Sequence, residues 1–255
     1  MDPMGWKTEV ERNVTLAFEE VHSKFLETVD VMSSPVIEAG FAPSMDQSGT
    51  TATALLVTKD IALVASLGDS RAVLSSRDFE HHDGPAWNDF PSMKAVQLTP
   101  DHVASDPKER DLVEARGGNV TSSKGGLQRV NGTLAITRSI GDANLAPVLS
   151  RVPHVLVLSH DEVRKWCGKD TFDEPTIDIP CFVILASDGL WDVMSNNEAV
   201  DMVVDTILRG SPTEVHASSS RLGGSLFQDA AERLAVEAYV RGSTDNIGVC
   251  VVAVA

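Results

Sequence analysis

The spacing of apolar residues near the start of the chain predicts one long helix over residues 8–32. Apolar side chains recur there every three or four residues, which is the period of one face of an α-helix. They are Val10, Val14, Phe18, Val21, Phe25, Val29 and Met32. Thr8 and Glu11 have the spacing of a capping box, so we expect the helix to begin at Thr8.

Short apolar runs after this helix predict strands. Residues 51–57 and 61–66 are two such runs separated by Lys59-Asp60, which is typical of a β-hairpin. A third run at 71–75 follows the turn dipeptide Gly68-Asp69. The polar residues 76–92 then predict a surface loop.

The second half of the chain mixes helices and strands. The predicted helices are 106–116, 196–209 and 227–241, and the predicted strands are 152–158, 181–187 and 247–255. Residues 182–186 are apolar without alternation, which indicates a strand buried on both faces. No repeat and no linker interrupts the pattern, so the expected organisation is one α+β domain over residues 1–255.

Charge and composition exclude several classes of protein. The chain has 37 acidic and 21 basic residues, a net charge of −16, which argues against binding a nucleic-acid backbone. A membrane span needs roughly 20 consecutive apolar residues, and no run in the sequence approaches that length. No secretory signal follows Met1. Hydrophobic residues make up 42% of the chain, which is ordinary for a globular fold.

The three cysteines predict no disulfide framework. Cys167, Cys181 and Cys250 have no metal-ligand spacing, and an odd, scattered set favours an intracellular, reducing compartment, the cytoplasm or the nucleus. An organelle remains open. Cys181 and Cys250 border or lie in apolar runs, so we expect both in the buried core.

Aspartates at strand ends are the candidate site for chemistry. Asp188 follows the buried strand directly, Asp245 precedes the last strand, and Asp69 lies in the Gly-Asp turn between two strands. Asp192 turns back toward Asp188 if a helical turn follows residue 188. Carboxylates from distant parts of a chain are the ligands that Mg²⁺ and Mn²⁺ prefer. Each aspartate taken singly is better explained as a turn residue than as a metal ligand.

Eight short segments, in order along the chain, carry a resemblance to a known family. They are Ser48-Gly49-Thr50-Thr51-Ala52, Gly68-Asp69-Ser70-Arg71, Leu98-Thr99-Pro100-Asp101-His102, Lys108-Glu109-Arg110 with Gly117-Gly118, Arg129-Val130-Asn131-Gly132, Ala135–Asp142, Ala186–Asp192, and Gly242-Ser243-Thr244-Asp245-Asn246. Over residues 48–255 the chain closely resembles the metal-dependent protein serine/threonine phosphatases of the 2C type.

The resemblance implies a fold, a reaction and a set of metal ligands. The fold is an α/β/β/α sandwich of two antiparallel sheets flanked by helices. Asp188 and Asp245 match ligands of a dinuclear Mn²⁺ or Mg²⁺ centre, while Asp69 and Asp192, with Asp188, match those of a third metal. The implied reaction is hydrolysis of phosphoserine or phosphothreonine in phosphoprotein substrates by a metal-bound water. Residues 101–131 match the mobile flap beside such sites, and a monomer is expected.

Other residues in these segments have structural explanations as well as functional ones. Arg71 and Arg138 are candidates either for phosphate contact or for pairing with an internal acid. Trp191 is expected to pack, and His102 is expected to make a structural hydrogen bond.

One family segment is absent from the 255 residues. The family pattern has an upstream Asp-Gly-His-Gly-Gly that supplies a bridging carboxylate. Apart from Asp188-Gly189, the only Asp-Gly in this chain is Asp83-Gly84, in the polar loop. We therefore expect a domain that lacks its first strands and is weak or inactive alone, because two close cations need shared anionic ligands. The alternative is a non-catalytic, phosphatase-like binding or regulatory module.

Overall fold

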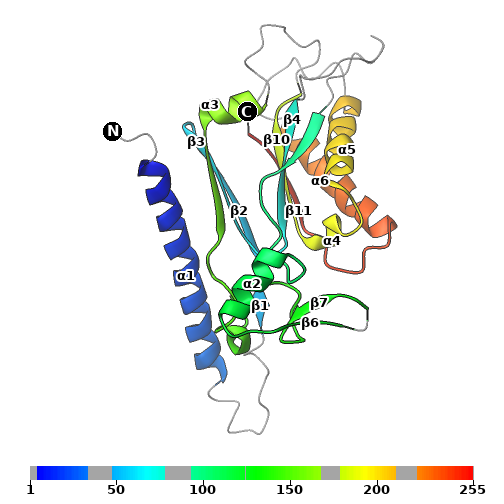
Figure 1. Cartoon of the computed structure of the whole chain (residues 1–255). Helices are drawn as coiled ribbons and strands as arrows, with labels where there is room; N and C mark the ends of the chain where they lie inside the picture. The colour runs from blue at the N-terminus through cyan, green and yellow to red at the C-terminus, as the bar shows by residue number, and fades with distance from the viewer. Residues whose placement is uncertain are drawn as a thin grey trace. The chain divides into compact units, whose positions relative to one another are not determined.

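The structure, a computed structural model, describes residues 5–33, 48–77, 93–123, 125–167, 179–210 and 223–254. Its helices are α1 (Gly5–Ser33), α2 (Pro107–Ala115), η3 (Ala143–Leu145), α3 (His160–Trp166), α4 (Asp188–Trp191), α5 (Asn196–Arg209) and α6 (Gly223–Val240) (Figure 1). Its strands are β1 (Gly49–Thr50), β2 (Ala52–Val57), β3 (Ile61–Leu67), β4 (Arg71–Arg77), β5 (Met93–Gln97), β6 (Val120–Ser122), β7 (Gln128–Val130), β8 (Ile140–Gly141), β9 (His154–Ser159), β10 (Phe182–Ala186) and β11 (Val249–Ala253).

The chain divides into two compact units. The first comprises Met1–Ala54, Val64–Ser70 and Pro100–Val157, and the second comprises Leu55–Leu63, Arg71–Thr99 and Leu158–Ala255. The mixture of helices with antiparallel strand pairs confirms the predicted α+β class. That the two units make one domain over residues 1–255 stays a prediction.

Helix α1 of the first unit confirms the predicted N-terminal helix. It begins at Gly5, so Thr8 lies inside the helix and the predicted capping box is wrong. The apolar stripe is half-buried at most of its positions, but Val21 is 52% exposed and the neighbouring His22 is buried instead. His22 lies on the buried side of the helix in place of Val21, because its Nδ1 accepts a 3.0 Å hydrogen bond from the Gly141 amide at β8.

Helix α2 of the first unit begins and ends where the sequence predicts. The Asp106 side chain accepts hydrogen bonds from the amides of Lys108 and Glu109, and Gly117 follows the helix with φ +84°. The stretch after it, part of the residues 101–131 that match the family's mobile flap, contains strand β6, which pairs with β7. A small core lies beneath these elements and comprises Ala104, Val113, Val130, Leu145, Val148 and Leu149.

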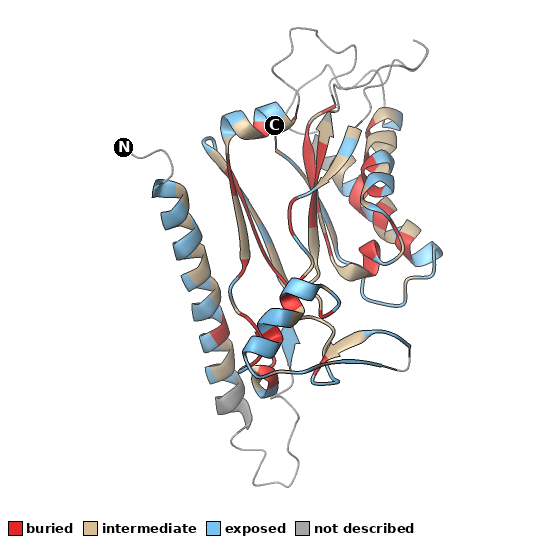
Figure 2. Cartoon of the chain, viewed as in Figure 1, coloured by how far each residue is buried: buried red, intermediate tan, exposed pale blue. Residues whose placement is uncertain are grey.

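A four-stranded antiparallel sheet in the order β11-β10-β4-β5 organises the second unit. Strand β10 is central, and Ile184 lies between Val73 of β4 and Val251 of β11. Ile184 is fully buried, as the unbroken apolar run predicts, and β10 is buried along most of its length (Figure 2). Strand β5 was not predicted from the sequence, because it is a short edge strand next to a polar segment.

Helices α5 and α6 cover this sheet with the main hydrophobic core. The core comprises side chains from β10, α4, α5 and α6, among them Phe182, Leu190, Val203 and Leu234. Trp191 is 8% exposed and belongs to this core, which confirms its predicted packing role. The core holds the strand ends that carry the candidate aspartates against a rigid helical layer.

The predicted strand pair 51–57 and 61–66 is confirmed as β2 and β3, which are neighbours in a three-stranded sheet of order β2-β3-β9. The Thr58 amide donates to the Ile61 carbonyl at 2.9 Å and closes the turn between them. The loop predicted over 76–92 lies mostly outside the described residues, except that 76 and 77 belong to β4. No described helix is both long and apolar enough to cross a membrane.

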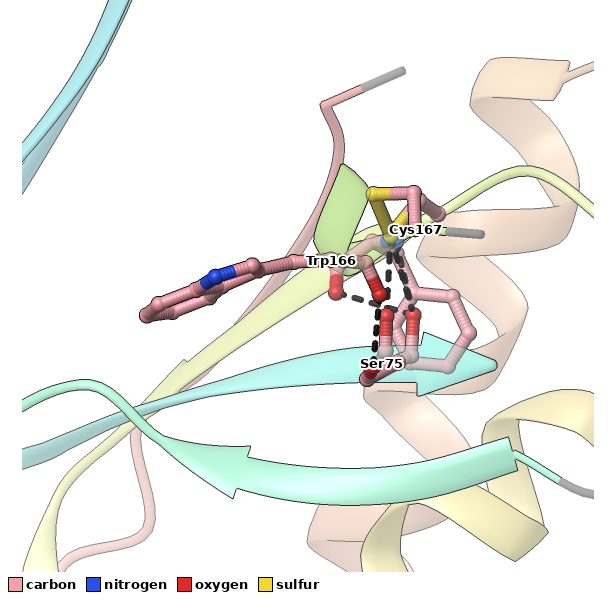
Figure 3. Close-up of a disulfide and its surroundings, with 6 residues drawn as sticks. Ser75, Trp166 and Cys167 are labelled. Atoms are coloured by element: carbon pink, nitrogen blue, oxygen red, sulfur yellow. Dashed lines mark hydrogen bonds between the residues drawn. A yellow bond between two sulfur atoms is a disulfide. The ribbon is translucent and has the colours of Figure 1, made fainter. Parts of the chain in front are cut away.

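The cysteine predictions need two corrections. Cys167 and Cys181 form a disulfide with a Cα–Cα distance of 5.7 Å, and both residues are buried (Figure 3). Sequence spacing misses this bond, because the fold brings the end of α3 next to the start of β10. Cys250 is exposed rather than buried, because it lies on the edge strand β11. Cys181 is buried as predicted.

The disulfide predicts a dependence of stability on reductant. It closes a loop with a sequence separation of 14, for which the chain-entropy argument gives a stabilisation of about 3 kcal/mol. We expect dithiothreitol to lower the free energy of unfolding by about that amount in urea titrations. Cys250→Ser is the control and should leave the urea unfolding curves with and without dithiothreitol unchanged. A urea midpoint insensitive to reductant would show that Cys167 and Cys181 are not paired.

Candidate metal site

Three of the four candidate aspartates lie in the second unit. Asp188 is the first residue of α4, separated from the end of β10 by one residue, and Asp245 lies in the connection between α6 and β11. The Asp192 amide donates to the Asp188 carbonyl at 2.9 Å, which is the helical turn that the sequence analysis required. Short helix α4 therefore carries Asp188 and Asp192 at its two ends.

The strand register explains why Asp188 and Asp245 approach each other. β10 and β11 are antiparallel, and Ala186 at the end of β10 pairs with Val249 at the start of β11. The residues just beyond this pair on each chain segment, Ser187 and Gly248, are also hydrogen-bonded. Two segments 57 positions apart in the sequence, from residue 188 to residue 245, thus meet at one rim of the sheet.

The electrostatics of this rim favour a cation. Burial raises the pKa of the Asp188 carboxyl, and the negative charges of Asp245 and Asp192 raise it further. Hydrogen bonds from the backbone amides of Asp188 and Gly189 act in the opposite direction and do not outweigh these effects. The charges of Asp245 and Asp192 beside Asp188 create a negative potential, which a bound divalent ion relieves.

The donor atoms of these aspartates suit such an ion, but their side chains are not arranged as a complete coordination shell. Aspartate oxygens are the preferred ligands of Mg²⁺ and Mn²⁺, and Mg²⁺ keeps several waters with one or two carboxylates. Within the described ranges, no three His, Cys, Asp or Glu side chains are arranged to hold a metal ion. The donor set therefore suits a hydrated cation, and the carboxylates do not form a preformed cage.

Asp69 lies in the first unit, in the turn after β3. Its neighbours fix that turn on both sides: the Gly68 carbonyl accepts a 2.9 Å bond from the His102 amide, and the Ser70 carbonyl accepts a 3.1 Å bond from the Thr53 hydroxyl. Gly68 has φ +101°, and a Cβ there would lie 2.3 Å from Thr51 Cγ2, so glycine is required.

His102 makes the structural hydrogen bond predicted for it. The residue is 1% exposed, and its Nδ1 lies 3.2 Å from the Gly68 amide and 3.0 Å from the Gly68 carbonyl. Which of the two it bonds depends on the tautomer of the ring. Burial lowers the pKa of His102 to about 4, the charge of Arg138 adds to that effect, and the charge of Glu109 opposes it.

This buried imidazole predicts a loss of stability in mild acid. The lowered pKa means that the unfolded chain takes up the proton first, so stability falls as pH drops from 6.5 toward about 4. The loss should reach at most about 3 kcal/mol. An NMR titration of the ring should give a pKa below about 5, well under the usual imidazole value of 6.5. A His102 midpoint near 6.5 would contradict the prediction.

Arg138 pairs with a buried acid, one of the two explanations that the sequence left open. Glu109, which the sequence analysis did not single out as the partner, accepts hydrogen bonds from Arg138 Nη2, from Arg138 Nε at 3.0 Å and from the Thr137 hydroxyl at 2.6 Å. Burial alone raises the pKa of Glu109, but the bonds from Arg138 and Thr137 hold it below its usual range. The position of Glu109 on the same helical face as buried Val113 was the available signal.

Arg71 occupies the wall of a cavity beside Asp192. Its guanidinium lies over the Trp191 ring, 5.2 Å from the centroid, and its Nη1 donates to Asn196 Oδ1 at 2.6 Å. The cavity has a volume of about 620 Å³ and includes Asp192 in its lining. Arg71 therefore connects strand β4 to both α4 and the start of α5, so its visible contacts are structural.

Carboxylates gathered at the strand ends of an α+β fold define a candidate cation site of the kind used in metal-dependent enzymes. Residues 11–247 match the protein phosphatase 2C family. The chain belongs to this family, whose members are generally metal-dependent protein serine/threonine phosphatases.

Curated relatives agree with this assignment. The chain is 38% identical over 207 residues to "Probable protein phosphatase 2C 68" of Oryza sativa subsp. japonica, a match that covers 81% of this chain and 45% of the relative. It is 32% identical over 251 residues to "Probable protein phosphatase 2C 24" of Arabidopsis thaliana, covering 98% of this chain and 59% of the relative. The chain thus spans about half the length of the curated relatives it matches.

Solved structures share the fold. "Crystal structure of serine-threonine phosphatase 2C from Toxoplasma gondii" matches with a TM-score of 0.56 and 22% identity, covering 96% of this chain and 69% of that one. "Structure of a C.elegans sex determining protein" matches with a TM-score of 0.56 and 23% identity, covering 89% of this chain and 44% of that one. At these identities the likeness concerns the fold alone.

Proposed function

We propose that the chain serves the hydrolysis of phosphoserine and phosphothreonine in proteins, with Mn²⁺ or Mg²⁺ as cofactor. The observation that carries the proposal is the meeting of the segments of Asp188 and Asp245 at one rim of the sheet, where the negative charges of Asp245 and Asp192 act on Asp188 and favour a bound cation. Family membership supports the reaction class. The substrates of this class are phosphoproteins. The proposed compartment is the reducing interior of a cell, although the Cys167–Cys181 disulfide is a bond more typical of oxidising compartments.

The ligand roles follow the family motifs. Asp188 and Asp245 are proposed to hold the paired metals, and Asp69 and Asp192 are proposed to join Asp188 at a third. A bound divalent ion lowers the pKa of a coordinated water and draws charge from phosphoryl oxygens. The second unit's own part is to supply Asp188, Asp192 and Asp245 from positions beside the end of β10 and the start of β11, because misplaced ligands weaken both binding and catalysis.

The finer architecture is also a proposal. We propose that the sheet of the second unit and the helices that cover it are one β layer and one α layer of the family's α/β/β/α sandwich. Residues 101–131, with α2 and the β6–β7 pair, are proposed as the flap that influences substrate choice. Monomeric assembly fits the family resemblance and stays a proposal.

A second candidate function has its own support. These 255 residues contain no Asp-Gly-His-Gly-Gly, and the described part of the chain contains no cluster of three potential metal ligands. Both observations favour weak turnover by this polypeptide alone, or a module that binds phosphoproteins without hydrolysing them. The two candidates differ in catalysis and share the substrate class.

Turnover of a phosphothreonine peptide with and without Mn²⁺ tests the proposal. We expect phosphate release that requires Mn²⁺, is abolished by chelation and remains slow for the 255-residue chain. Fast turnover would contradict the expectation of a weak enzyme. Peptide binding without any phosphate release above background would favour the non-catalytic module.

A further inference from the structure

Ser187 stands directly before α4 but does not cap it. Its backbone is extended, with φ −71° and ψ 166°, as an N-cap requires, yet its side chain makes no capping bond. Ser159 before α3 and Ser195 before α5 both form complete capping boxes. The Ser187 hydroxyl is therefore directed elsewhere, although the position and residue type favour a cap.

The hydroxyl instead joins the segment that follows Asp245. Ser187 Oγ donates to the Asn246 carbonyl at 2.9 Å and accepts from the Gly248 amide at 3.0 Å. The Ser187 amide donates to the Gly248 carbonyl at 3.0 Å. One residue thus makes three hydrogen bonds to the segment just after Asp245, and the hydroxyl uses both its donor and an acceptor.

Gly189 provides a second close contact on the other side of Asp188. A Cβ at position 189 would lie 2.5 Å from the Asn246 carbonyl oxygen, so only glycine permits this approach. Asp188 therefore lies between two residues that both contact the backbone of Asn246. Asp245 precedes Asn246 directly, and its Oδ1 accepts a 2.6 Å bond from the Asn246 amide.

We infer that Ser187 is a positioning residue, which fixes the backbone of Asp245 beside that of Asp188 and so sets the spacing of the cation ligands. Like charges on the two aspartates push the segments apart, and the hydroxyl bonds oppose that separation. The inference rests on the proposed function, because it assumes that these aspartates hold the metal. Outer-shell groups of this kind typically change metal affinity 10–100-fold.

The test is the affinity for Mn²⁺ alone, measured by calorimetry on the full chain. Ser187→Ala should weaken Mn²⁺ binding about tenfold or more, and Ser187→Thr, which keeps the hydroxyl, should retain most of the affinity. Ser159→Ala is the matched control, because it removes a hydroxyl with donor and acceptor bonds at the cap of α3. It should lower stability and leave Mn²⁺ affinity unchanged.

A folded Ser187→Ala protein that binds Mn²⁺ as tightly as the unaltered chain overturns the inference and leaves the metal site standing. Absence of Mn²⁺ binding in the unaltered chain overturns the proposed metal site and the inference with it. If Ser187→Ala does not fold, the pair Ser187→Thr and Ser187→Val carries the test, because the two side chains differ by a hydroxyl in place of a methyl. Equal Mn²⁺ affinities in that pair would overturn the inference.

Discussion

Without metal, the Asp188→Asn protein should be more stable than the unaltered chain. With Mn²⁺ added, it should be less stable than the unaltered chain. Burial and the charges of Asp245 and Asp192 disfavour an ionised carboxyl at this position, so the neutral amide removes a repulsion from the folded state. The unaltered chain should gain about 2.7 kcal/mol at an Mn²⁺ concentration 100 times the Kd. Thermal unfolding should show this gain as a rise in Tm of about 5–10 °C, which Asp188→Asn loses.

The effect of Asp188→Asn on stability should have opposite signs without and with Mn²⁺, and this reversal distinguishes a metal ligand from a structural residue. Asp205→Asn is the control, because Asp205 accepts bonds from Arg209 and Arg233 that lower its pKa. That substitution should lower Tm in both conditions and leave the Mn²⁺ increment intact. An Asp188→Asn protein with a lower Tm without metal and an unchanged Mn²⁺ increment would place Asp188 among ordinary turn residues.

Removing the charge of Glu109 should cause the largest loss of stability among the substitutions considered. The Glu109 and Arg138 side chains are only 10% and 15% exposed, so Glu109→Gln leaves a guanidinium nearly buried without its counter-charge. Breaking a buried ion pair from one side costs about 3–5 kcal/mol. Urea unfolding at pH 7 should show the loss as a lower midpoint with an unchanged slope.

The double substitution Glu109→Gln with Arg138→Gln separates the pair from its surroundings. Because both charges are then absent, the double variant should lose less stability than the sum of the single variants. Glu20→Gln, at the exposed Glu20–Lys24 pair of α1, is the surface control and should leave the midpoint unchanged. Additive losses at Glu109 and Arg138 would show that the two side chains do not depend on each other.

Helices with complete local signals were predictable from the sequence. Helix α5 has the predicted bounds, 196–209, because the Ser195–Glu198 capping box begins it and Gly210 follows its last residue. Helix α2 has Asp106 before it and two glycines after it. In α1 the same kind of signal failed, because Thr8 and Glu11 have capping-box spacing inside a helix that already begins at Gly5.

Features that depend on distant residues were not predictable. The Cys167–Cys181 bond needs α3 and β10 to meet, and nothing in the spacing of the cysteines reports that. The capping position of Ser187 gives no sign that its hydroxyl binds residues 59 and 61 positions later. Glu109 is one acid in a charged helix until the fold places Arg138 over it.

The candidate site was predictable in part, because strand ends fix where a carboxylate emerges. Asp188 and Asp245 follow and precede apolar strands, and the antiparallel pairing of β10 with β11 brings those ends together. Asp192 required only a helical turn, which α4 supplies. The predicted role of Asp69, which lies in the other unit, remains a proposal.

The central claim is that the aspartates of α4 and of the segment before β11 bind a divalent cation. Calorimetric titration of Mn²⁺ into the unaltered chain, with Asp188→Asn and Asp245→Asn in parallel, tests it most directly. We predict saturable binding with a Kd in the millimolar range or tighter, weakened at least about 100-fold in each variant, beyond the effect of outer-shell changes. Binding heats that are the same in all three proteins, or absent from the unaltered chain, would contradict the claim.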